Sequence, residues 1–280
     1  MKKLGIIALA LFIQNVSAQT NRFVYQVTMK PDAENKTDIK TENAYLDISP
    51  EKSVFYSENR IKRDSIMQKA FQGGGGGRGS INRDQMESLR SNINYSVEKD
   101  KTNQKTYFKD RIGRDIYSYE EDRPLNWKIE SETRKIGEYK VQKAETDFGG
   151  RKWTAWFTTD LPYQDGPYKF GGLPGLIVKI EDDKGDYSFD LMKNYKIAEF
   201  PTLNQFGNTL KVKRTDFVKQ QQKFKTDPMS FMNQGGGVAA PMRIGGPGGG
   251  GNQNPADMRK RMEERIKEEA KRNSNPIELQ

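Results

Sequence analysis

The chain has 280 residues, a formal net charge of +9, and neither cysteine nor histidine. Without cysteine it cannot form disulfides or carry the lipid of a lipoprotein, and without histidine it has no Ser-His or Cys-His nucleophile and no histidine-based zinc site. The modest basic surplus suits an anionic surface, such as lipopolysaccharide, anionic lipid or an acidic partner, or a solvated mixed-charge surface. The sequence contains no basic block with interleaved aromatic residues, so we do not expect nucleic-acid binding.

Residues 1–18 have the pattern of a cleavable secretory signal peptide. Lys2 and Lys3 precede an apolar run at residues 4–13, and Val16-Ser17-Ala18 is a small-residue cleavage pattern. The apolar run is shorter than the roughly 20 residues of a membrane-spanning helix. We expect cleavage after Ala18, which lowers the net charge to +7. The protein is then periplasmic or secreted and does not span a membrane.

Residues 19–228 predict a β-rich domain built from antiparallel strands. Residues 23–29 alternate apolar side chains on one face, and turn sequences at residues 49–52, 147–150 and 182–185 join further strand pairs. Consecutive strands joined by short turns pair as a meander. Because an apolar sheet face must be covered or curl, we expect a mainly β fold, an antiparallel curved sheet or half-barrel.

Side-chain alternation also predicts which residues face the core. Trp153 and Trp156 fall on opposite faces of one strand, so we expect one indole to be buried and the other to lie nearer the surface. Farther along the chain, Leu176, Val178 and Ile180 are expected on one face of the next strand.

Four segments depart from the strand pattern. Residues 62–92 contain GGGGGRGS and are expected to form a long flexible insertion with some helical character. Residues 229–254 predict a Gly/Pro-rich linker, residues 255–273 a C-terminal helix with a narrow apolar stripe, and residues 274–280 a short tail.

Few patterns carry recognisable chemistry. GGGGGRGS lacks the Gly-Lys-Ser/Thr ending of a phosphate loop, and the carboxylates of EDDKGD lack the spacing of a calcium loop and suit a hairpin turn. Asp160 and Asp165 could form the carboxylate pair of a hydrolase, although the sequence shows no group of residues that would form a cleft and shift one pKa. We expect no catalytic residue, no metal and no cofactor. Asp64-Ser65-Ile66 resembles the acceptor triplet of a bacterial periplasmic O-glycosylation system, which makes Ser65 a candidate modification site.

The segment YKFGGLPGLI at residues 168–177 closely resembles the namesake motif of the GLPGLI family, exported proteins of the Bacteroidota. The stretches YLDISPEKSVFYSE, DGPYKFGGLPGLIVKIED and RNSNPIEL resemble other blocks of that family, although Val141 stands where a cysteine is common. The resemblance implies a protein of unknown molecular function whose relatives are often encoded near outer-membrane receptor and transport proteins. By analogy alone, the block order is also similar to lipoprotein-carrier-like half-barrels.

Two functions follow as hypotheses. The first is a periplasmic, non-enzymatic binding protein for a hydrophobic or cell-envelope ligand, held on the concave face of the sheet. Its candidate binding residues are Trp156, Tyr168, Phe170, Leu173, Pro174 and Leu176. The alternative is an envelope interaction or assembly factor without a small ligand, whose partners are outer-membrane receptor or other envelope proteins, or lipid. The segment at residues 168–177 is either an architectural corner or a binding lip.

Overall fold

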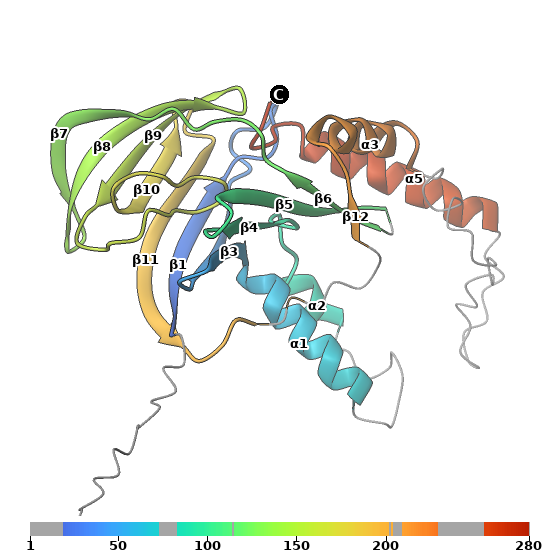
Figure 1. Ribbon diagram of the computed structural model, residues 1–280. Helices are drawn as coiled ribbons and strands as arrows, with labels where there is room; N and C mark the ends of the chain where they lie inside the picture. The colour runs from blue at the N-terminus through green and yellow to red at the C-terminus, as the bar shows by residue number, and fades with distance from the viewer. Residues whose placement is uncertain are drawn as a thin grey trace, which may run out of the picture.

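A computed structural model describes residues 19–72, 83–113, 115–201, 203, 209–228 and 255–279. Within them, one open twelve-stranded sheet forms the body of the chain, as Figure 1 shows, so the predicted mainly β fold is confirmed. The predicted signal peptide at residues 1–18 and linker at residues 229–254 lie outside the described residues.

The sheet is built from strands that follow the chain in two runs. The strands are β1 (Thr20–Met29), β2 (Lys40–Ile48), β3 (Lys52–Ser57), β4 (Ser96–Asp100), β5 (Lys105–Ile112), β6 (Asp115–Glu120), β7 (Lys128–Ile136), β8 (Tyr139–Phe148), β9 (Arg151–Thr158), β10 (Leu176–Asp182), β11 (Tyr187–Ile197) and β12 (Thr209–Lys211). The described helices are α1 (Glu58–Gln72), α2 (Arg83–Ser88), α3 (Arg214–Thr226) and α5 (Pro255–Arg272).

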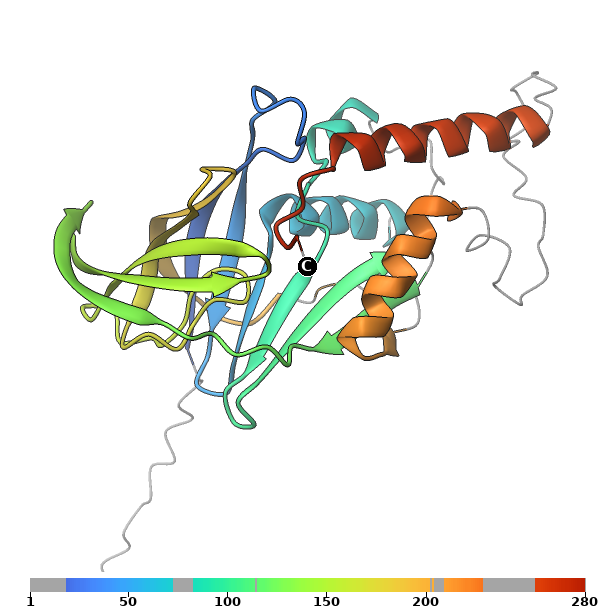
Figure 2. The same ribbon diagram turned by 90° about the horizontal axis from the view of Figure 1, so that it is seen from above.

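Two antiparallel meanders meet at the centre of the sheet. Strands β1 to β6 form one meander and β7 to β11 the other, and β1 pairs with β11 to join them. The short strand β12 adds to β6 in parallel at one edge. The sheet curves around its core, as Figures 1 and 2 show from two sides. The strand order therefore agrees with the meander expected from short sequential turns.

An aromatic core fills the concave face of this sheet. Phe23, Tyr25, Val27 and Met29 are buried in it, as their alternation predicts. Phe170 lies among other rings, with its centroid 4.8 Å from that of Trp153. Edge-to-face and tilted ring pairs of this kind add to the stabilisation that comes from burying apolar area. The face expected to hold a ligand is therefore packed with side chains.

The GGLPGLI segment is the corner that leads from β9 back into β10. A Cβ atom on Gly175 would lie 2.0 Å from the carbonyl oxygen of Thr158, so only glycine allows this close approach of two backbones. Lys99 Nζ, which is partly buried, binds the segment just before this corner through Asp165 Oδ1 at 2.7 Å and the carbonyl oxygen of Phe170 at 2.5 Å. Packing and partly buried hydrogen bonds thus fix the turn.

Two expectations about strand faces are wrong, each for a local reason. Val178 lies on the outer face, because a β-bulge between Ile177 and Lys179 shifts the alternation and leaves Leu176 and Ile177 in the core. Trp156 does lie opposite Trp153, but it is also buried, because the guanidinium of Arg134 covers its ring at 3.6 Å.

Helix α1 occupies the start of the segment that the sequence predicts as a flexible insertion. It continues directly from β3, and Ser57 Oγ accepts a hydrogen bond from the N–H of Arg60 at the helix N-terminus. Ile61 packs on the outer cluster of Val24, Tyr45, Val54 and Tyr56. A capped first turn and an anchored side chain therefore hold a helix that has almost no amphipathic pattern.

Candidate functional site

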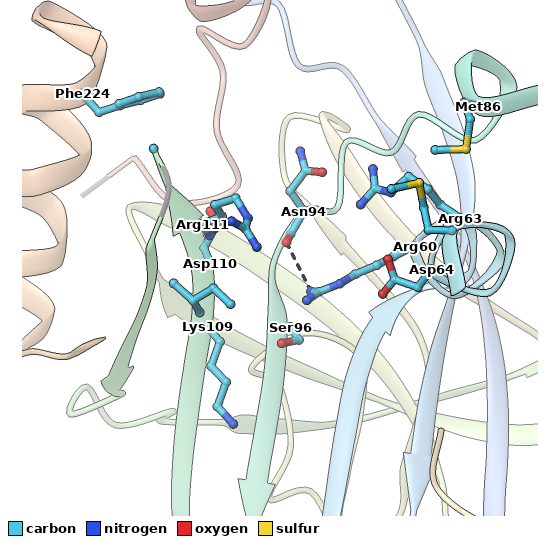
Figure 3. A pocket seen from close by; sticks show the side chains of 13 residues that line it. Arg60, Arg63, Asp64, Met86, Asn94, Ser96, Lys109, Asp110, Arg111 and Phe224 are labelled. Carbon is cyan, nitrogen blue, oxygen red and sulfur yellow. Dashed lines mark hydrogen bonds between the residues drawn. The ribbon is translucent and has the colours of Figure 1, made fainter. Parts of the chain in front are cut away.

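A cavity of about 520 Å³ lies where β4 begins and β5 ends, between α1 on one side and α3 on the other (Figure 3). Its volume falls in the range of small-molecule sites. Most of the side chains that line it are charged or polar, and a few are apolar.

Helix α1 presents one face to the cavity. Arg60, Arg63, Asp64 and Met67 follow the spacing i, i+3, i+4, i+7, which aligns side chains on one side of a helix. Arg60 Nη1 reaches across toward the sheet and donates to the carbonyl oxygen of Asn94 at 3.5 Å, the dashed line in Figure 3. That distance is long for a hydrogen bond, so this contact uses little of the guanidinium's capacity.

The opposite wall combines the end of β5 with α3. Lys109, Asp110 and Arg111 come from β5 and Phe224 from α3, whereas Met86 of α2 lies on the α1 side of the cavity, beside Arg63 (Figure 3). In Figure 3 Arg111 and Asp110 lie across from the α1 residues, and Phe224 approaches from the helix on the far side. The cavity therefore has a charged floor and apolar flanks.

Arg60 and Asp64 of the cavity are incompletely paired among the described residues. Burial lowers the pKa of Arg60, and the nearby Asp64 only partly opposes this effect. Burial raises the pKa of Asp64, against the charges of Arg60, Arg63 and Arg111. The buried Oδ2 atom of Asp64 has no hydrogen-bond partner among the described residues. An unpaired buried oxygen is costly, so a ligand that donates to it would relieve that cost.

Asp110 is the second carboxylate of the cavity. Burial raises its pKa to about 6, although the backbone N–H of Arg111 and the charges of Arg60 and Arg111 favour the ionised form. The Arg111 N–H donates to Asp110 Oδ1 at 2.7 Å. Lys109 Nζ is paired with Glu98 Oε2 at 2.9 Å, so three guanidinium groups face two carboxylates, one of them easily protonated, and the cavity keeps an excess of positive charge. Such a site favours an anionic group, which guanidinium groups bind in a bidentate manner.

The structure does not bring the six predicted binding residues together. Tyr168, Phe170, Leu173 and Leu176 are buried in the core, with at most 1% of each exposed. Pro174 is exposed at the corner, and Trp156 lies in the outer cluster with Val141 and Val178. None of the six lines the cavity.

The other candidate residues are equally separated. Ser65 is exposed on α1, beside a shallow groove between α1 and α2, so its triplet lies on a helix. Asp165 is buried and paired with Lys99, whereas Asp160 is exposed at the end of β9, so the two do not share a cleft. The carboxylates of EDDKGD serve the hairpin, where Asp182 Oδ1 accepts from the N–H groups of Asp186 and Tyr187. No group of three or more acidic side chains that could hold a metal occurs in the described ranges.

The cavity residues were missed because their segments carry no recognised motif. The sequence IKRD in α1 fell inside the predicted insertion, and Asp110-Arg111 follows an ordinary alternating strand. The signal that could have found them is the i, i+3, i+4 spacing of Arg60, Arg63 and Asp64, which becomes visible once residues 58–72 are taken as a helix.

Comparison with known proteins supports the fold and leaves the function open. Residues 148–179, which contain β9 and the GGLPGLI corner, match the family model Porph_ging, described as a protein of unknown function. No curated protein matches the chain. No helix in the described part of the chain has the length and apolar character needed to cross a membrane.

Solved structures of PNGF-II are similar to the chain. The structure in the P21 space group has a TM-score of 0.53 and 18% identity, and the structure in the C2 space group has a TM-score of 0.52 and 19% identity. Each match covers 74% of this chain and 34% of the PNGF-II chain. The similarity thus shows a shared β-rich fold, and the matched region is about a third of PNGF-II.

Proposed function

We propose that the protein is an exported, non-enzymatic binding protein that takes an anionic cell-envelope ligand with an apolar part. The observation that carries this proposal is the convergence of Arg60, Arg63 and Arg111 on one cavity that Met67 and Phe224 flank. A phosphate or carboxylate group would bind the guanidinium groups, and the apolar part would lie against the methionine and phenylalanine side chains. The predicted secretory leader and the resemblance to the GLPGLI family support a periplasmic or secreted location.

Titration calorimetry with residues 19–280 tests the proposal. The probes are dihexanoyl phosphatidic acid, dihexanoyl phosphatidylcholine and inorganic phosphate. We expect phosphatidic acid to bind at least tenfold more tightly than phosphatidylcholine, because only the former presents net negative charge to the cavity. Weaker binding of inorganic phosphate would show that the apolar part contributes.

Two variants of α1 connect the binding to the cavity. Arg63→Gln should weaken phosphatidic acid binding by about 10- to 100-fold, the effect of losing one charge-assisted hydrogen bond. Lys69→Gln removes the same charge from the same helix at an exposed position outside the cavity, and should bind as the wild type does. Equal binding by both variants, or no binding of any probe, would refute the proposal and favour the envelope interaction factor.

A second candidate, a hydrolase, rests on one observation. Asp64 and Asp110 line the same cavity and burial raises both pKa values, a setting that suits general acid catalysis near neutral pH. Mass spectrometry of a bound ligand after incubation with wild-type and Asp110→Asn chains separates the two candidates. Turnover that Asp110→Asn abolishes would favour hydrolysis, and recovery of unchanged ligand favours binding.

A further inference from the structure

The last described residues of the chain bind to a site that shares no residue with the cavity. We call residues 274–279 the tail, and we call the side chains of Arg123, Arg151, Tyr168, Lys169 and Tyr187 that hold it the tail site. Figure 1 shows the C-terminus beside the end of the sheet, and Figure 2 shows it over the middle of the molecule. The tail-site side chains come from the corner, from β9 and β11, and from the loop after β6.

Arg151 binds the tail, mainly through backbone carbonyl groups. Its buried guanidinium uses Nη1 for Asp182 Oδ2 at 2.6 Å and Asp186 Oδ2 at 3.3 Å. The remaining three donor bonds go to the tail: Nη2 to Asn275 Oδ1 at 2.6 Å and to the Pro276 carbonyl oxygen at 2.8 Å, and Nε to the Ile277 carbonyl oxygen at 3.1 Å. All five N–H groups of the guanidinium are therefore used.

The side-chain amide of Asn275 is recognised from both ends. Its Nδ2 donates to the carbonyl oxygen of Lys30 at 2.7 Å, while its Oδ1 accepts from Arg151. Tyr187 OH donates to its backbone carbonyl oxygen at 2.7 Å. An aspartate here could not donate to the Lys30 carbonyl, and a shorter side chain would leave one N–H group of Arg151 without its partner. The contacts therefore select asparagine.

Glu278 is recognised through its charge. Lys169 Nζ donates to its Oε1 at 2.5 Å and Arg123 Nη2 to its Oε2 at 2.7 Å, and Tyr168 OH also donates to Oε1. Lys169 is itself buried, and four aromatic rings surround its ammonium group within 6 Å. Glu121 supplies one carboxylate to Lys169 and Arg123, and the tail supplies the second.

The tail itself contributes little to the hydrophobic core. Asn275 is its buried residue, Ile277 and Glu278 are partly buried, and Ser274, Pro276 and Leu279 are exposed. Its removal would leave the aromatic core in place and uncover buried cations that are already positioned for Asn and Glu side chains. A site of this kind binds a peptide by polar contacts to alternating backbone and side-chain groups.

We propose that the tail site is a peptide-binding site specific for the sequence Asn-Pro-apolar-Glu, and that the chain's own tail is an exchangeable occupant. Another polypeptide that presents this sequence binds there in trans when the tail is displaced. The proposal is independent of the cavity and of the proposed function, because the two share no residue.

Fluorescence anisotropy with the labelled peptide RNSNPIELQ tests exchange. The proteins are residues 19–280 as wild type and as the variant Asn275→Ala/Glu278→Ala, which weakens the resident tail. We expect the variant to bind the peptide at least tenfold more tightly than the wild type, because a tethered competitor has an effective concentration of about millimolar. The variant Asn273→Ala/Glu268→Ala makes the same changes at exposed positions and should behave as the wild type does.

Specificity and folding are tested with the same reagents. A peptide with alanine at the Asn and Glu positions should lose at least tenfold in affinity for the variant. If circular dichroism shows that the variant is unfolded, addition of RNSNPIELQ should refold it. Failure of a folded variant to bind more tightly than the wild type, equal binding of the alanine peptide, or failure of the peptide to rescue an unfolded variant would each overturn the proposal.

Discussion

The tail site and the cavity both combine arginines with carboxylates, but they differ in how completely these groups are hydrogen-bonded. In the tail site Arg151 has a partner for each of its five donors, at distances of 2.6 to 3.3 Å. In the cavity Arg60 has one long contact, and Asp64 Oδ2 has no hydrogen-bond partner among the described residues. Full pairing makes a buried charge cluster costly to disrupt, whereas incomplete pairing sacrifices stability and leaves groups for a ligand.

The largest expected effect is the loss of Arg151. Arg151→Ala leaves Asp182 buried without its cation and frees the tail, so we expect the free energy of unfolding to fall by about 3–5 kcal/mol. Urea denaturation measures this change. Lys152→Ala removes the neighbouring cation, whose side chain is 55% exposed, and should cost less than about 1 kcal/mol. Similar costs for the two variants would show that the fully paired Arg151 contributes no more to stability than an exposed cation does.

The stability of the protein in acid gives a second test, through Glu121, which pairs with Arg123 and Lys169 of the tail site. Burial alone would raise its pKa, but hydrogen bonds from Arg123 and Lys169 and the charge of Lys169 outweigh burial and lower the pKa from 4.5 to about 2. A lowered folded-state pKa contributes stability above about pH 4.5 that is lost as the pH falls toward 2. Relative to Glu121→Gln, the wild type should therefore lose on the order of 2–3 kcal/mol between pH 5 and pH 2.

Urea denaturation at a series of pH values gives this difference directly. The adjacent Glu120→Gln, at a side chain 47% exposed, controls for the removal of one carboxylate from the same strand end. A difference between wild type and Glu121→Gln that stays constant from pH 5 to pH 2 would contradict the linkage.

Local pattern was sufficient to predict the sheet, because strand alternation is a local property. Phe23, Tyr25, Val27 and Met29 alternate without interruption and all lie in the core. The same rule failed at Val178, because a bulge inserts one residue and reverses the faces that follow. It also failed for the exposure of Trp156, because its cover, Arg134, belongs to another strand.

The site residues could not be predicted because their partners are distant in sequence. Arg151 meets Asn275 across 124 residues, and Lys169 meets Glu278 across 109. Nothing in the NPIE sequence itself indicates which cations it contacts. The cavity could not be predicted for a different reason. Only helical geometry places Arg60 and Asp64 on one face, and residues 58–72 were not predicted to be a helix.

In the cavity the sign of the pH effect should reverse. Burial raises the pKa of Asp110 from 3.8 to about 6, so its contribution to stability is present below pH 3.8 and is lost as the pH rises through 6. Asp110→Asn keeps the oxygen that accepts from the Arg111 N–H, and should be more stable than the wild type at pH 7 by about 1–2 kcal/mol, with the gain shrinking toward pH 4. The exposed Asp183→Asn controls for the removal of one negative charge. If Asp110→Asn is less stable than the wild type at pH 7, the neighbours of the ionised Asp110 stabilise it, as those of Glu121 do beside the tail site.

The smallest expected effect isolates one contact of the tail by means of two matched glycines. Gly149 and Gly185 both have a φ of +62°, so each alanine variant bears the same left-handed strain of about 1–2 kcal/mol. A Cβ atom at Gly149 would also lie 2.9 Å from Glu278 Cγ, whereas nothing lies within 4 Å of one at Gly185. We therefore expect Gly149→Ala to cost about 1 kcal/mol more than Gly185→Ala in urea denaturation. Equal costs for the two glycines would show that the Glu278 side chain shifts to make room for the added methyl group without a loss of stability.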